Sequence, residues 1–182
     1  MKVERTGFDG LFVIEPTIIG DERGYFMESF NAKNFESSGL QHHFVQDNQS
    51  HSQKNVIRGL HFQKPPYAQT KLVRVLYGRV LDVVVDLRSS QPTFRKAFSL
   101  ELSSDNKKQL LIPKGFAHGF SVLSDTAGLF YKCDTFYCAE AEAGIYFQDP
   151  ELAIDWHISM QDALTSQRDA HLGSINSLPN FF

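Results

Sequence analysis

Short segments in which apolar and polar residues alternate run along most of the chain. Alternation with a period of two residues predicts strands that are buried on one face. Helical periodicity between these segments is almost absent, and many strands without intervening helices favour an all-β sandwich or barrel. The predicted strand segments are 10–20 (with a break at Pro16), 44–48, 55–63, 70–88, 95–103, 108–115, 118–124, 128–137 and 143–149.

The longest of these segments, residues 70–88, has a glycine near its middle. Before Gly78, the residues at 73, 75 and 77 (Val, Val, Tyr) alternate with those at 72, 74 and 76 (Leu, Arg, Leu). After it, those at 81, 83, 85 and 87 (Leu, Val, Val, Leu) alternate with those at 82, 84, 86 and 88 (Asp, Val, Asp, Arg). Two alternating runs separated by a turn residue are typical of a hairpin. We therefore predict two paired antiparallel strands that turn at Gly78.

Two segments predict helices. Residues 31–40 begin with Asn31, a good N-cap, and end near Gly39, a good helix stop. Residues 159–170 begin with Ser159 and have Asp162 three positions later, which resembles a capping box. Short peripheral helices are therefore expected beside the strands.

The composition fits one globular domain over residues 1–182. The chain has 182 residues, of which 42% are apolar and 21% are charged, so it can bury a hydrophobic core. Its formal net charge is −3 and it has no basic tail. A nucleic-acid partner is therefore not expected, because such proteins carry a clustered positive surface.

No apolar stretch reaches the roughly 18 residues that a membrane-spanning helix needs. The first ten residues, MKVERTGFDG, are too charged for a signal peptide. Cys133 and Cys138 are the only cysteines, too few for a disulfide framework or a zinc site. A cytoplasmic protein without a membrane partner is expected.

The segment VIRGLHFQ, residues 56–63, places polar residues inside an apolar strand. Burying such groups is costly unless they have partners or a function. His61 could be a satisfied core histidine, a metal ligand or a catalytic base. Gly59 predicts a β-bulge, which would let Arg58 and His61 reach the same cavity. The stiff stretch KPPYAQT then leads to Lys71 at the start of the next strand.

A second motif, PKGFAHGF, contains Pro113, Gly115 and His118. This spacing resembles the second motif of cupins, which are small jelly-roll proteins. The first cupin motif usually supplies H-x-H and an acid, but here His61 is followed by Gln63 and no acid comes after it. Two histidines and an amide are a poor ligand set for iron, manganese or zinc, so no metal is expected.

A cavity with histidine, lysine and arginine but no metal suits acid–base chemistry. A histidine such as His61 can take a proton next to a carbonyl, and a cation can stabilise the enolate that forms. Tyr131 could return the proton. A base histidine needs an orienting carboxylate, for which Asp82 and Asp86 are candidates, although both could equally lie on a solvated strand face.

Three blocks of the chain closely resemble one known family: FVQDNQSHS to QPTF (residues 44–94), LLIPKGFAHGFSVLSDTA (110–127) and FQDPELAIDW (147–156). They are similar to the dTDP-4-dehydrorhamnose 3,5-epimerases. The resemblance implies a cupin-type double-stranded β-helix, or jelly-roll barrel, without metal or other cofactor. It also implies a homodimer with a shared active site.

The reaction of this family inverts C3 and C5 of dTDP-4-dehydro-6-deoxy-D-glucose to give dTDP-4-dehydro-L-rhamnose. The resemblance implies that His61 is the base and that Asp169, rather than Asp82 or Asp86, is its carboxylate partner. It implies that Tyr131 is the acid on the opposite face of the sugar and that Lys71 lies beside the enolate.

The resemblance also implies a set of substrate contacts. Arg23 is implied to contact the diphosphate and Glu28 the nucleotide base, both with help from the partner subunit. The others are Gln46, Asn48, Arg58, His118 and Tyr137.

Other functions stay open from the sequence. Relatives of this family epimerise only C3 or only C5 of a dTDP-4-keto-6-deoxyhexose. A barrel that binds sugar nucleotides without catalysis and a metal-dependent cupin enzyme are alternatives from other classes.

Overall fold

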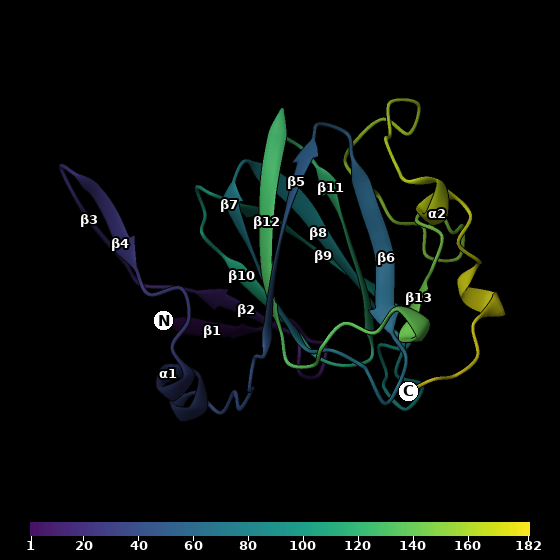
Figure 1. Cartoon of the computed structure of the whole chain (residues 1–182), viewed down its shortest axis with the longest axis horizontal. Helices are drawn as coiled ribbons and strands as arrows, with labels where there is room; N and C mark the ends of the chain where they lie inside the picture. The colour runs from purple at the N-terminus through teal and green to yellow at the C-terminus, as the bar shows by residue number, and fades with distance from the viewer.

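The computed structural model describes residues 1–182 and contains two antiparallel sheets that face each other (Figure 1). The six-stranded sheet has the order β1 (Lys2–Arg5), β2 (Phe12–Glu15), β10 (Gln109–Ile112), β7 (Lys71–Tyr77), β12 (Thr126–Cys133) and β5 (Gln46–Gln53). The five-stranded sheet has the order β13 (Glu142–Gly144), β6 (Ile57–Gln63), β11 (Phe116–Val122), β8 (Arg79–Asp86) and β9 (Ala97–Ser103). The predicted all-β jelly-roll architecture is confirmed.

The main hydrophobic core fills the space between the two sheets. Both sheets contribute to it, with Val73 and Leu129 from one side and Val84 and Phe120 from the other, all of them buried. Side chains two positions apart on a strand share a face. Polar residues at such positions therefore also enter the space between the sheets, and this is how the fold delivers the groups of the site.

A second core covers the outer face of the five-stranded sheet. Leu81 and Val83 of β8 pack there against Ile145 and Trp156 of the C-terminal part of the chain. Strand β8 is therefore buried on both faces. This explains its near-continuous apolar sequence, and it corrects the alternative of a solvated strand face for its two aspartates.

The hairpin predicted for residues 70–88 is wrong. Strands β7 and β8 belong to different sheets, and the chain crosses from one to the other at Gly78, whose φ is +76°. A Cβ at this position would collide with the backbone carbonyl oxygen of Thr126. A sharp corner between sheets and a hairpin turn have the same alternating pattern, so the pattern alone could not distinguish them.

The first predicted helix is confirmed as α1, Ala32–Ser37. The side chain of Asn31 accepts hydrogen bonds from the backbone N–H groups of Lys33 and Asn34. The buried ring of Phe35 anchors α1 on the outer face of the six-stranded sheet. No helix of the structure is long and apolar enough to cross a membrane.

The second predicted helix is mostly wrong, because α2 spans only Gln167–Ala170. Residues 160–162 instead form a turn and a bend, and Leu164 then forms a parallel bridge with Val56. The helix is capped by Ser166, whose hydroxyl oxygen accepts a hydrogen bond from the backbone N–H of Asp169. Two 3₁₀ turns, Ala139–Ala141 and Ile175–Ser177, complete the helical elements.

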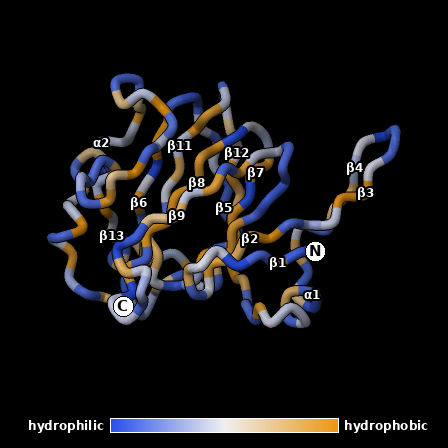
Figure 2. Tube along the Cα trace, turned by 180° about the vertical axis from the view of Figure 1, so that it is seen from behind, coloured by the Kyte–Doolittle hydropathy of each residue, from blue (hydrophilic) through white to orange (hydrophobic).

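A two-stranded hairpin, β3 (Ile18–Asp21) with β4 (Gly24–Met27), projects away from the two sheets (Figures 1 and 2). Its strands pair only with each other. Ile19 is 65% exposed and Phe26 is 68% exposed. Isolated hairpins have little stability of their own in water, so an arm with such apolar residues needs a covering surface.

Candidate active site

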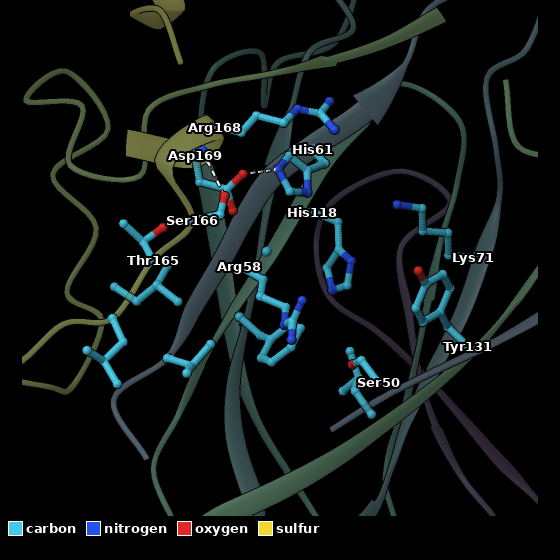
Figure 3. Close-up of a pocket in the computed structure, with 16 residues that line it drawn as sticks. Ser50, Arg58, His61, Lys71, His118, Tyr131, Thr165, Ser166, Arg168 and Asp169 are labelled. Carbon is cyan, nitrogen blue, oxygen red and sulfur yellow. Dashed lines mark hydrogen bonds and ion pairs between the residues drawn. The ribbon is translucent and has the colours of Figure 1, made fainter. Parts of the chain in front are cut away.

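A cavity of about 480 Å³ opens between the two sheets (Figure 3). A second cavity, of about 330 Å³, adjoins it. His61, Lys71 and Tyr131 line both cavities, so they lie where the two meet. The first cavity is also lined by Ser50, Arg58, His118, Arg168 and Asp169, and the second by Gln46, Asn48, Gln63, Gln69, Tyr137 and Glu142.

His61 is bonded to a buried carboxylate. Its Nε2 lies 2.8 Å from Oδ1 of Asp169, and the other carboxylate oxygen accepts the backbone N–H of Gly59 at 3.1 Å. Burial acts to raise the pKa of Asp169, but hydrogen bonds from His61 and Gly59 outweigh it, and the pKa falls below its ordinary value. Asp169 is therefore a carboxylate at neutral pH and can orient the imidazole, leaving Nδ1 free to accept a proton.

A β-bulge at Gly59 aims the neighbouring side chains. The pairing of β6 with β11 shifts register between His61 and Arg58, as the sequence predicted. Gly59 has a φ of +121°, and a Cβ there would lie 2.5 Å from Cα of Gly119. Both Arg58 and His61 consequently reach the first cavity. The Arg58 guanidinium is held by a hydrogen bond to the hydroxyl of Ser52 at 3.0 Å.

Lys71 and Tyr131 lie on the opposite wall, on strands β7 and β12 of the six-stranded sheet (Figure 3). The Nζ atom of Lys71 is 5.8 Å from the centre of the Tyr131 ring. Burial lowers the pKa of Lys71, and burial raises the pKa of Tyr131. The phenol therefore stays protonated at neutral pH and can act as an acid. A poorly solvated ammonium gains more from a negative charge that forms beside it.

His118 also has a carboxylate partner. Its Nε2 lies 2.9 Å from Oδ2 of Asp82, and both side chains are buried between the sheets. Asp86 instead binds Arg88 and Thr93, away from the cavity. The expectation that Asp82 or Asp86 orients His61 is wrong, since Asp82 orients His118. The position of Asp82 along its strand could not show which histidine it would contact, because that depends on which strands pair.

Three predicted substrate contacts, Gln46, Asn48 and Tyr137, line the second cavity. The carboxylate of Glu142 accepts hydrogen bonds from the Tyr137 hydroxyl at 2.6 Å and from Nη1 of Arg168 at 2.9 Å. Neither Glu142 nor Arg168 was predicted from the sequence as a site residue. Arg168 is next in sequence to the predicted site residue Asp169, and this could have marked it as a candidate. Glu142 is flanked by alanines, and nothing in the sequence around it indicates a role.

Arg23 and Glu28 lie outside both cavities of their own chain. Arg23 is at the turn of the projecting hairpin and pairs with Asp21. Glu28 follows β4 and accepts hydrogen bonds from the side chains of Asn31 and Asn34. The structure therefore brings together nine of the eleven predicted site residues and leaves these two apart.

The geometry suits proton transfer on a small polar molecule. A histidine–carboxylate pair stands on one wall of the cavity, and a protonated phenol with a cation stands on the other. Nowhere in the structure do three or more His, Cys, Asp or Glu side chains gather at a single point in the way a metal ion requires.

Comparison with known proteins agrees with this geometry. Residues 5–177 match the family model described as dTDP-4-dehydrorhamnose 3,5-epimerase. The chain belongs to the dTDP-4-dehydrorhamnose 3,5-epimerase family. The resemblance seen in the sequence is thereby confirmed, and with it the class of enzyme, an isomerase that epimerises sugar nucleotides.

Members of this epimerase family are similar over nearly the whole chain. The dTDP-4-dehydrorhamnose 3,5-epimerase of Shigella flexneri is 51% identical over 170 residues, which cover 93% of each chain. The crystal structure of the Elizabethkingia anophelis NUHP1 epimerase has a TM-score of 0.94 at 49% identity and covers 100% of this chain and 99% of that one. A Legionella pneumophila epimerase, in complex with dTDP-4-keto-L-rhamnose, has a TM-score of 0.93 at 49% identity, with 98% and 94% covered.

Asp169→Asn should reduce turnover by roughly 10²- to 10⁴-fold, because an amide cannot hold the imidazole and its positive charge as a carboxylate does. KM should change little, since Asp169 acts on His61 rather than on substrate. Steady-state kinetics with a dTDP-4-keto sugar measure both constants. Asp155→Asn, at an exposed carboxylate outside the cavities, is the control. Unchanged turnover in Asp169→Asn would remove Asp169 from the mechanism.

Proposed function

We propose that the chain is a dTDP-4-dehydrorhamnose 3,5-epimerase that works by proton removal and return on opposite faces of the sugar. The observation that carries this proposal is the placement of base and acid on opposing sheets. His61, with Asp169, stands on the five-stranded sheet, and Tyr131 stands on the six-stranded sheet. Epimerisation needs a proton to leave from one face and return to the other, and this arrangement offers one group to each face.

The C4 ketone of the substrate acidifies the hydrogens on C3 and C5. His61 takes one of these protons, and the electron pair left behind moves onto the ketone oxygen to give an enolate. Lys71, with support from His118 and Arg58, stabilises this charge as it develops. Because burial weakens the solvation of the Lys71 ammonium, its attraction to the enolate oxygen is not lost to water.

Tyr131 returns a proton to the carbon from the other side, and the raised pKa of its phenol keeps that proton available at neutral pH. Once His61 has released its proton to solvent and Tyr131 has regained one from it, the same sequence at the second carbon inverts the other centre. No oxidation or reduction occurs, because the electron pair remains within the substrate throughout. His61, Lys71 and Tyr131 line both cavities, so the reacting carbons would lie at their junction.

We also propose that the active enzyme is a homodimer with a shared active site. The exposed apolar residues of the β3–β4 hairpin, Ile19 and Phe26, suit a cover by a second copy of the chain. Arg23 and Glu28 reach no cavity of their own chain, and the hairpin would carry them into the partner's. The free thiols of Cys133 and Cys138 support the expected cytoplasmic location.

Epimerisation should appear as exchange with solvent. In D₂O, with dTDP-4-keto-6-deoxyglucose as substrate, we expect deuterium to enter C3 and C5 and both carbons to invert. Proton NMR measures both changes. His61→Ala should slow exchange at both carbons by roughly 10²- to 10⁴-fold, since the base is gone. Tyr131→Phe should keep exchange but lose inversion at both carbons, because each carbon is then reprotonated on the face from which its proton left.

His157→Ala and Tyr146→Phe, which change residues outside both cavities, should behave as the wild type. Wild-type exchange and inversion at one carbon alone would replace the proposal with a single-carbon epimerase. Undiminished exchange in His61→Ala would refute the assigned base, and undiminished inversion in Tyr131→Phe would refute the assigned acid.

The shared site can be tested with mixed dimers of Arg23→Ala and His61→Ala chains, purified by two different tags. If Arg23 serves the partner's cavity, one site of each mixed dimer is intact, and about half of wild-type activity returns. If Arg23 serves its own cavity, both sites stay damaged. Activity no higher than half that of the Arg23→Ala homodimer would therefore contradict the shared site, as would a monomer in sedimentation equilibrium.

A further inference from the structure

Gln63 stands where metal-binding cupins have the second histidine of their first motif, and the reaction proposed above gives it no role. Its side chain is buried, with 5% exposure, and it lines the second cavity. Gln63 follows His61 by two positions on β6. The two residues therefore belong to the same face of one strand.

All the polar atoms of the Gln63 side chain are used. Nε2 donates to the backbone carbonyl of Tyr67 at 2.7 Å and to that of Phe136 at 3.3 Å. Oε1 accepts the backbone N–H of Cys138 at 2.7 Å. One buried amide thus joins two separate loops, one that follows β6 and one that follows β12.

The loop on the β12 side, residues 134–138, carries the exposed rings of Phe136 and Tyr137. It contains no helix or strand. The backbone hydrogen bonds that Thr135, Phe136 and Tyr137 make are all with glutamine side chains. Gln69 bonds the carbonyl of Thr135 at 2.7 Å, and Gln46 bonds the N–H of Tyr137 at 2.9 Å.

Of these three glutamines, Gln63 alone bonds to residues on both sides of Tyr137 and to the Tyr67 loop as well. Backbone groups without strand partners depend on such side-chain bonds for a fixed position. The Tyr137 ring is then directed by its hydroxyl, which donates to Glu142. The position of Tyr137 relative to His61 therefore depends on an amide anchored on the strand of the base itself.

We infer that Gln63 is a positioning residue that holds Tyr137 at the cavity mouth for substrate binding. The inference rests on the proposed function for its effect on kinetics. Gln63 reaches neither His61 nor Tyr131 by a hydrogen bond, so it serves binding and leaves proton transfer intact. The glutamine that makes a poor metal ligand has a structural use of its own.

Gln63→Met keeps the length of the side chain and removes all three hydrogen bonds. We expect KM to rise about 10-fold while kcat stays within about 3-fold of wild type, because the loop loses its fixed position but the base and acid do not. In a Tyr137→Ala background the same substitution should change KM by less than about 2-fold, since the residue it positions is absent. A Gln63→Met effect of equal size in both backgrounds, or none in the wild type, would overturn the inference.

A second measurement needs no substrate. Amide hydrogen exchange of Cys138 should be at least about 10-fold faster in Gln63→Met than in wild type, because its acceptor is lost. Gln63→Glu retains an acceptor and should protect this amide better than Gln63→Met does. Gln69→Met, which removes a bond to Thr135 only, is the matched control and should leave Cys138 unchanged.

Equal Cys138 exchange in wild type and Gln63→Met would also overturn the inference. The two proposals can fail separately. A wild-type protein that never epimerises refutes the proposed function, while the amide exchange still decides whether Gln63 holds the loop. An active wild type with an unaffected Gln63→Met refutes the inference alone.

Discussion

The hydrogen bond between His61 and Asp169 ties together parts of the chain that are far apart in sequence. Asp169 comes from the short helix α2 near the C-terminus, and its carboxylate bonds both His61, the proposed base, and the backbone N–H of Gly59. One buried carboxylate therefore fixes the imidazole, the bulge that aims Arg58, and the path of the C-terminal segment across β6. The cost of burying its charge is offset only because several donors surround it.

The two-sheet fold gives the site its two-sided character. The interior-facing positions of facing strands supply groups to opposite walls: His61 and His118 from the five-stranded sheet, and Lys71 and Tyr131 from the six-stranded sheet. A rigid core of apolar side chains lies between the same strands and sets their spacing. In the proposed mechanism, the fold itself keeps the base and the acid on opposite sides of the carbon that is inverted.

Local patterns predicted what depends on neighbouring residues. Alternation revealed the strands, Asn31 marked the start of α1, and Gly59 marked the bulge.

The corner at Gly78 was mistaken for a hairpin because the alternation of β7 and β8 is the same whichever sheet each strand joins. The helix expected from Ser159 was overridden by the bridge from Leu164 to Val56. Both outcomes depend on pairing between residues that are far apart in sequence, and local periodicity contains no information about such pairing. The same limit explains why Asp82 was a candidate partner for the wrong histidine, and why Asp169 entered only through the family resemblance.

The proposed mechanism requires Asp169 to hold His61 with Nε2 protonated, so that Nδ1 is the atom that accepts the substrate proton. Nitrogen-15 NMR of the labelled His61 imidazole in the ligand-free enzyme distinguishes the two tautomers directly. We expect wild-type His61 to carry its proton on Nε2 and this preference to weaken in Asp169→Asn. A wild-type His61 with its proton on Nδ1 would contradict the proposed mechanism.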